Sequence, residues 1–281
     1  MMNELNIEIN GIGTLNDTTF LISEDAVFPV ITLRVFVKNP REGDRITKLV
    51  SKETVRYKRN GRNDLAEGQT VLRNQLSPQE FNLSIDKFLG GDLNVTLNAK
   101  GKDRFGNALI FEITPYAGKI LAIQPNKEKV RKVLVHPYLS AIVYLKSQFE
   151  QFLTDGNPAY VNGFGLYRIA QATVPQIWSW KENAAYANAD FEQRKKAAAA
   201  YPAELRASNP TLYKNLPDFT EKQVELEALQ SYGTGMYFIP KQATITRKWS
   251  WIRNPKDDGY ADKCLAILAD VAQGKFPTGW N

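Results

Sequence analysis

Two charged side chains, Lys146 and Glu150, stand in an otherwise apolar stretch of the chain. Over residues 137–153 the apolar residues recur at the spacing of a helix, and both charges fall within the apolar arc. The two positions are i and i+4 on the predicted helix, so the side chains can touch. A charged pair on the buried side of a helix is costly unless it is paired or faces a wet cleft. The pattern therefore indicates either a structural ion pair or a site with a carboxyl group available for proton transfer.

A glycine turn follows this helix. Gly163 and Gly165 allow the backbone to approach a ligand closely, because glycine has no side chain. Aromatic faces stack well on sugar rings, although aromatic residues at high density are also typical of a core. The aromatic residues near the turn are Tyr160, Phe164, Tyr167, Trp178 and Trp180.

Three motifs in this order resemble goose-type lysozymes and lytic transglycosylases, including the lysozyme modules of phage and type VI secretion effectors. They are KSQFEQF at 146–152, NGFGLYR at 162–168 and PQIWSWKEN at 175–183. A late Trp251 and the Tyr-Ala-Asp run at 260–262 also fit. The similarity covers about residues 127–271 and implies an α-helical lysozyme-like domain. It also implies that peptidoglycan glycan strands are the partner and that the protein is an antibacterial, cell-wall-directed glycoside hydrolase.

The resemblance also shows where the chemistry is altered. The family carries a catalytic Glu where this chain has Lys146, and a Gln where it has Arg168. Ala170 stands where goose-type enzymes can carry Asp. Glycoside cleavage needs a carboxylic acid to protonate the leaving oxygen, and an ammonium would repel the developing positive charge. The implied protein binds glycan with weak or absent hydrolysis. Its implied substrate-binding residues are Ser147, Gly163, Phe164, Gly165, Tyr167, Arg168 and Trp178.

Two alternatives stay open, so the sequence leaves enzymatic activity undecided. In the first, the protein is an active muramidase that uses Glu150 as the acid, with help from Asp155 in the following loop. A neighbouring Lys146 would favour the ionised carboxylate, which is the wrong direction for a general acid. In the second, the protein is a structural or adaptor component of a phage tail or a type VI secretion-like machine, bound to a spike or tail protein.

The N-terminal part of the chain predicts a β domain. Short segments with period-two alternation, separated by turn residues, favour a β-sandwich or a small barrel. The basic segment 56–74 predicts an exposed loop or hairpin, and nucleic-acid binding through it is not expected because no recognition motif accompanies the charge. The predicted strands are 19–23, 29–38, 80–85, 93–97 and 107–113.

Helical patterns begin near Pro125, so we predict an α+β chain with a β domain at 1–124 and a helical domain at 125–281. Asn126 is expected to cap the first helix, Thr220 with Gln223 resembles a capping box, and Pro202 predicts a break. Residues 233–251 predict an extended loop or hairpin. The predicted helices are 126–134, 137–153, 173–208, 221–232 and 260–272.

The amino-acid composition limits the kinds of functional site that the chain can form. A net charge of +6 suits an anionic partner such as cell-wall glycan. The single Cys excludes an intrachain disulfide framework, and Cys264 lies in an apolar helical pattern typical of a core. With a single His, His136, we expect a structural role for it, no metal site and no cofactor. We find no secretory signal and no membrane span, so we expect synthesis in the cytoplasm and, for a cell-wall target, delivery by a non-classical route.

Overall fold

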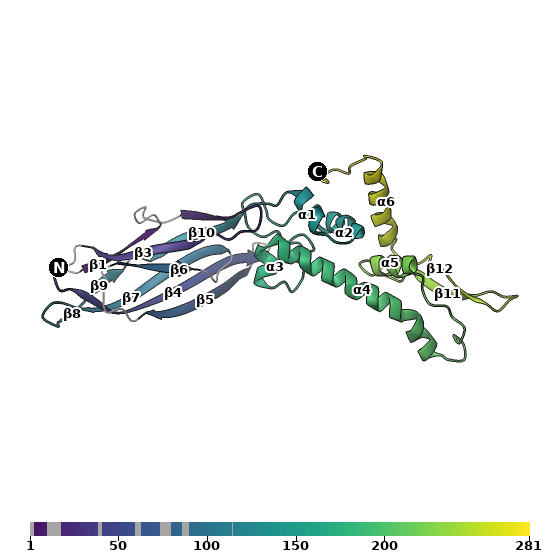
Figure 1. Cartoon of the computed structure of the whole chain (residues 1–281), viewed down its shortest axis with the longest axis horizontal. Coiled ribbons are helices and arrows are strands. Elements are labelled where there is room, and N and C mark those ends of the chain that lie inside the picture. Colours follow the sequence, from purple (N-terminus) through teal and green to yellow (C-terminus); the bar gives the residue numbers. More distant parts are fainter. Residues whose placement is uncertain are drawn as a thin grey trace. The chain divides into compact units, whose positions relative to one another are not determined.

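The chain has a mixed α and β fold, as predicted, with strands mainly in its first part and helices in its second (Figure 1). Contacts divide it into two compact units. The first unit comprises Met1–Pro125, Gln151–Gly165 and Ala170–Ser179, and the second comprises Asn126–Glu150, Leu166–Ile169 and Trp180–Asn281. The computed structural model describes residues 3–9, 18–38, 41–59, 63–73, 80–85, 90–113 and 115–281.

The strands of the first unit form two sheets. The four-stranded sheet has the order β6-β3-β1-β9, and β1 is antiparallel to β3 but parallel to β9. The larger sheet has the order β2-β10-β7-β4-β5, with β8 paired to β7 (Figure 1). The strands are β1 Asn3–Ile9, β2 Thr18–Ile22, β3 Ile31–Lys38, β4 Arg45–Arg59, β5 Asn63–Arg73, β6 Glu80–Ile85, β7 Gly91–Lys102, β8 Ala108–Leu109, β9 Phe111–Ile113 and β10 Tyr116–Ala122.

A common apolar core joins residues from both sheets of the first unit. Along β7 buried and exposed residues alternate, so Leu93, Val95 and Leu97 point to one side. Leu33 of the smaller sheet belongs to the same buried cluster. Residues much later in the chain complete it, namely Phe152, Phe164, Ile177 and Trp178. Residues 151–165 and 170–179, which we had assigned to the helical domain, therefore pack in the β unit.

The predicted strands are found, with differences at their ends. The strand at 80–85 is confirmed, whereas 93–97 is the middle of the longer β7 and 107–113 divides into β8 and β9. Strands β1, β4, β5 and β10 were not predicted. The described part of the basic segment forms the β4–β5 hairpin, and residues 60–62 and 74 lie outside the described residues.

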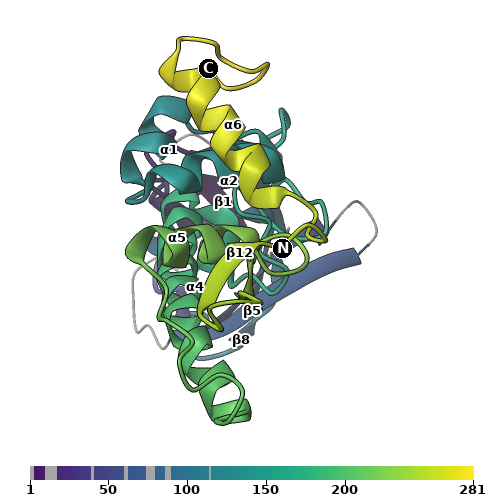
Figure 2. The same cartoon turned by 90° about the vertical axis from the view of Figure 1, so that its right-hand side faces the viewer.

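The second unit consists of helices and one hairpin. Helix α5 contacts α4, and α6 contacts both α5 and α2 (Figure 2). Asn126 caps α1 through its side chain, and Thr220 with Gln223 forms the capping box of α5, so both cap predictions are confirmed. The elements are α1 Lys127–Val133, α2 Pro137–Ser147, α4 Trp180–Ser208, α5 Glu221–Gln230, β11 Phe238–Gln242, β12 Trp249–Arg253 and α6 Tyr260–Ala272.

Three helix predictions were wrong. Helix α2 ends at Ser147 rather than Leu153, because Gln148 and Phe149 adopt positive φ angles of 52° and 66°. The predicted helix 173–208 is two helices, α3 Val174–Trp178 and α4, separated by the extended residue Ser179. No break occurs at Pro202, which lies buried inside α4. A proline removes one backbone hydrogen bond, and a long helix with a packed face tolerates that loss.

Two expectations about chemistry and membranes can be compared with the fold. Cys264 is a free, fully buried thiol in α6, as its apolar surroundings predicted, and burial raises its pKa to about 12. Among the described residues, no helix is long and apolar enough to cross a membrane.

Candidate functional site

The C-terminal end of α2 is held to residues 166–169 by a buried serine. Ser147 Oγ donates a hydrogen bond to the Leu166 carbonyl at 2.7 Å, and lies 3.0 Å from the Val143 carbonyl in the preceding turn. The hydroxyl thus satisfies a backbone acceptor outside its own helix. Ser147 is 7% exposed, so its role in this structure is to fix the backbone.

Two other polar residues of the motifs do the same. In the second unit, the side-chain oxygen of Asn183 accepts a hydrogen bond from the Tyr167 amide at 2.9 Å. In the first unit, Gln151 Nε2 donates to the Ile177 carbonyl at 2.8 Å. Asn183 and Gln151 are both fully buried. The polar residues that carry the resemblance therefore join backbone segments that are distant in sequence.

Lys146 carries its ammonium group into an aromatic environment. Its Nζ donates to the Tyr167 carbonyl at 3.3 Å and lies 4.2 Å from the centre of the Tyr167 ring and 5.3 Å from that of Tyr232. These ring faces attract a cation. Burial lowers the pKa of Lys146 to about 8, and the Arg194 charge acts in the same direction while Asp190 opposes it. The predicted position of a catalytic carboxyl thus holds an enclosed cation.

A polar network surrounds this lysine. The Tyr167 hydroxyl donates to Asp190 Oδ2 at 2.8 Å, and Arg194 Nε donates to the same oxygen at 2.8 Å. The Arg194 guanidinium also lies 4.0 Å from the Tyr232 ring centre. Burial, followed by Tyr232, raises the pKa of Tyr167, which keeps its phenol neutral. Tyr167 is 3% exposed and serves as a buried hydrogen-bond donor in this network.

Glu150 is paired with Arg168. Arg168 NH2 donates to Glu150 Oε2 at 3.2 Å, and Arg168 Nε lies 3.4 Å from the Lys146 carbonyl. Helix α2 ends at Ser147, so Glu150 is not a helical neighbour of Lys146 as the predicted helix 137–153 implied. The Glu150 side chain is 46% exposed, whereas that of Arg168 is 11% exposed. Guanidinium is a permanent cation, so the Glu150 carboxyl group has a charged partner in Arg168.

The glycine turn and the predicted sugar-contact aromatics are buried. Gly163, Phe164, Gly165 and Trp178 belong to the first unit, and each is buried. Gly165 has a φ of 72°, so glycine suits the turn conformation there.

Trp178 is a core residue in this structure, which does not fit its predicted contact with sugar. Its ring lies 5.6 Å from Tyr57 in an edge contact and 6.2 Å from Phe152 in a stacked one. A Cβ atom added to Gly90 would meet the Trp178 ring at 2.3 Å, so backbone also covers the indole. The aromatic density reflects packing at this position.

Glu227 of α5 is a buried carboxylate that was not predicted from the sequence. Glu227 lines a hollow of about 340 Å³ in the second unit together with Arg194, Tyr201 and Glu204. Burial raises its pKa, which is the property expected of a general acid. Its two oxygens, however, accept hydrogen bonds from the backbone amides of Tyr237 at 3.3 Å and Phe238 at 2.9 Å. Glu227 thus anchors the start of β11, and one acidic residue within a helix gave no sequence signal for this role.

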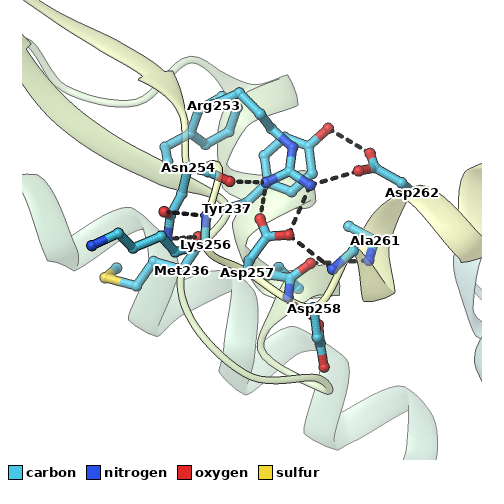
Figure 3. Close-up of polar contacts among 12 residues, drawn as sticks. Met236, Tyr237, Arg253, Asn254, Lys256, Asp257, Asp258, Ala261 and Asp262 are labelled. Carbon is cyan, nitrogen blue, oxygen red and sulfur yellow. Dashed lines mark hydrogen bonds and ion pairs between the residues drawn. The ribbon is translucent and has the colours of Figure 1, made fainter.

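A second polar cluster joins the hairpin to α6 (Figure 3). Arg253 NH2 donates to Asp257 at 2.8 Å and to Asp262 at 2.5 Å, and the Tyr237 hydroxyl donates to Asp262 at 2.9 Å. The hydrogen bond from Arg253 is the main reason that the pKa of Asp262 is lowered. Asp262 belongs to the Tyr-Ala-Asp run of the resemblance, and its contacts here are structural.

His136 has structural surroundings, in agreement with the prediction. It occupies the N-cap position of α2, its ring centre lies 4.6 Å from that of Phe191, and its Nε2 is 3.4 Å from Glu225 Oε1. Burial lowers its pKa. Within the described ranges, no group of three or more His, Cys, Asp or Glu side chains is arranged to hold a metal ion.

Comparisons with known proteins identify no family. No protein-family model matches the chain, and the search of curated proteins finds no match.

Proposed function

We propose that this chain is a lysozyme-like protein that targets peptidoglycan glycan strands and has weak or absent hydrolytic activity. In this proposal a β-sandwich-like domain precedes an α-helical lysozyme-like domain. The proposal is supported mainly by a difference between the residues of the motifs. Ser147 and Asn183 keep backbone-fixing roles, while Lys146 places an enclosed cation at the position of the catalytic acid.

The chemistry of glycoside cleavage supports low activity. The reaction needs a protonated carboxyl group near the glycosidic oxygen and a means of stabilising an oxocarbenium-like transition state. Lys146 provides a positive charge at the first position, and Glu150 is ion-paired to Arg168. Neither arrangement supplies a proton donor of the required kind. The net charge of +6 favours attraction to the carboxylates of a cell wall.

A sacculus-binding assay with product analysis tests the proposal. Purified peptidoglycan is incubated with the wild-type protein and with Glu150→Gln between pH 4.5 and 8, and both the pellet and the soluble products are analysed. We expect both proteins to sediment with the sacculi and neither to release muropeptides. Soluble products from the wild type that disappear in Glu150→Gln would instead establish the active muramidase that uses Glu150.

The same assay distinguishes peptidoglycan targeting from the alternative in which the protein is a structural or adaptor component. A protein of a phage tail or a type VI secretion-like machine would stay in the supernatant and co-purify with a spike or tail protein. That result would contradict peptidoglycan targeting. Peptidoglycan targeting also requires that the protein reaches the cell wall.

A further inference from the structure

A hollow of about 510 Å³ lies in the first unit, lined in part by Asp155 and Tyr160. It forms where β4, β7 and β10 meet the loop at residues 153–160. Its volume falls within the range of small-molecule sites. Most of its charged side chains come from the β strands, which lie outside the region of the lysozyme resemblance.

Two lysines supply positive charge to this hollow. Lys58 is on β4 and Lys119 is on β10, and both are exposed. Lys119 is the register partner of Asp92 on β7. Within the part of the chain that the structure describes, neither ammonium group makes a hydrogen bond or an ion pair. The two cations are therefore available to an anionic group of a ligand.

Part of the lining is a loop with internal hydrogen bonds. The Asn157 amide donates to Asp155 Oδ1 at 2.9 Å, and Asn157 Nδ2 donates to Asp155 Oδ2 at 3.0 Å. The Leu153 amide donates to the Asn157 carbonyl at 2.8 Å. A wall that is already ordered loses little conformational entropy when a ligand binds.

Apolar surface completes the hollow. Tyr57, Tyr160 and Pro158 line it. Tyr57 and Pro158 are buried, whereas Tyr160 is half-buried and packs edge-on against Phe164 at 4.9 Å. A sugar ring has an apolar face that suits an aromatic or proline surface, and hydroxyl groups that suit carboxylate and amide partners. Asp92 and Asp155 add negative charge, which disfavours a polyanion such as nucleic acid. The combination fits a ligand with one carboxylate and several hydroxyl or amide groups.

We propose that this hollow binds a carboxylate-bearing amino-sugar disaccharide of the kind that repeats in peptidoglycan. The carboxylate would contact the Lys119 ammonium group, with a sugar ring against the half-buried Tyr160. The identity of the ligand rests on the proposed function, whereas the position of the site rests on the geometry of the first unit.

Calorimetric titration of the full chain tests the site. The ligands are the disaccharide of N-acetylglucosamine and N-acetylmuramic acid, and diacetylchitobiose, which lacks the carboxylate. We expect the acidic disaccharide to bind at least about ten-fold more tightly, and Lys119→Glu to weaken it by about ten-fold or more. Lys119→Gln, which removes the charge without reversing it, is expected to weaken binding in the same direction. Unchanged thermal unfolding shows that each variant is folded.

Lys52→Glu is the matched control. Lys52 is exposed on β4, and its side chain is on the same face of the strand as that of Lys58. The two lysines are about 20 Å apart along the strand. Wild-type affinity in Lys52→Glu supports a local site. An equal loss in Lys52→Glu and Lys119→Glu would overturn the site, and equal binding of both disaccharides would overturn the role of the carboxylate.

Comparison with sacculus binding separates this inference from the proposed function. If wild type and Lys119→Glu sediment with sacculi and bind the acidic disaccharide equally, the hollow is not the site although peptidoglycan targeting stands. If the disaccharide binds in a Lys119-dependent way but sacculi are not bound, the site stands and the proposed function fails. Absence of binding to both the disaccharide and sacculi overturns both.

Discussion

Lys146 shows how one environment has opposite consequences for an acid and a base. Removal from water disfavours any charge, so it would raise the pKa of a glutamate at this position and lowers that of the lysine to about 8. The rings of Tyr167 and Tyr232 and the Tyr167 carbonyl partly compensate for lost hydration. The neighbouring Glu150 has its own partner in Arg168, so the two charges that the sequence places together are separate in the structure.

The half-buried ammonium group of Lys146 predicts a characteristic pH dependence of the free energy of unfolding. Between pH 8 and the ordinary lysine pKa near 10.5, folded Lys146 loses its proton while the unfolded chain keeps it. The unfolded state then binds more protons, so the Lys146 contribution to the free energy of unfolding rises with pH, by at most about 1.4 kcal/mol per pH unit. We expect Lys146→Met to lack this rise when urea unfolding is compared from pH 7.5 to 9.5.

The buried thiol and phenol act in the opposite direction. Burial raises the pKa of Cys264 and of Tyr167, so their ionisation in the unfolded chain, from about pH 9 for the thiol and about pH 10 for the phenol, lowers the free energy of unfolding as the pH rises. The Lys146 effect is therefore the difference in slope between the wild type and Lys146→Met. The control is Lys196→Met, at an exposed position of α4, which should keep the wild-type slope. Parallel curves for wild type and Lys146→Met would contradict burial of the ammonium.

At the scale of elements, the short segment at residues 166–169 depends on the two helices that hold it. Ser147, at the end of α2, donates a hydrogen bond to the carbonyl of Leu166 in this segment. Asn183, near the start of α4, accepts one from the backbone amide of Tyr167. The left-handed residues Gln148 and Phe149 end α2 immediately after Ser147. A continuous helix would have carried Glu150 along the α2 surface instead of to Arg168.

Asn183→Ala is expected to destabilise the protein by about 1–3 kcal/mol, because the buried Tyr167 amide loses its acceptor. Urea unfolding at pH 7 measures the change. Asn215→Ala provides the comparison, since Asn215 is exposed and its substitution should cost less than about 0.5 kcal/mol. Equal effects of the two substitutions would show that the Asn183 contact does not fix the segment.

At the scale of the whole molecule, the chain does not divide into units at one point. The core of the first unit includes residues that follow the α2 helix, among them Phe152, Phe164 and Trp178. Gly90 packs directly against the Trp178 ring, so residues of the β unit contact a side chain that is much later in the sequence.

A fragment of residues 1–125 is therefore expected to lose cooperative unfolding, because its core lacks four large buried side chains whose individual loss typically costs about 2–5 kcal/mol. Near-ultraviolet circular dichroism and urea titration of the fragment and the full chain measure this. A fragment with a cooperative transition close to that of the full chain would show that residues 151–165 and 170–179 are dispensable for the β unit.

The sequence by itself determined the elements whose signals are local. The Asn126 cap and the Thr220–Gln223 capping box follow from side chains within a few residues of the backbone groups they affect. The bounds of α6 match the apolar helical pattern of residues 260–272. Tertiary structure decided the surroundings of Lys146, the partner of Glu150 and the burial of Trp178. Each depends on which distant segments exclude water or supply a partner, and helical periodicity does not contain that information.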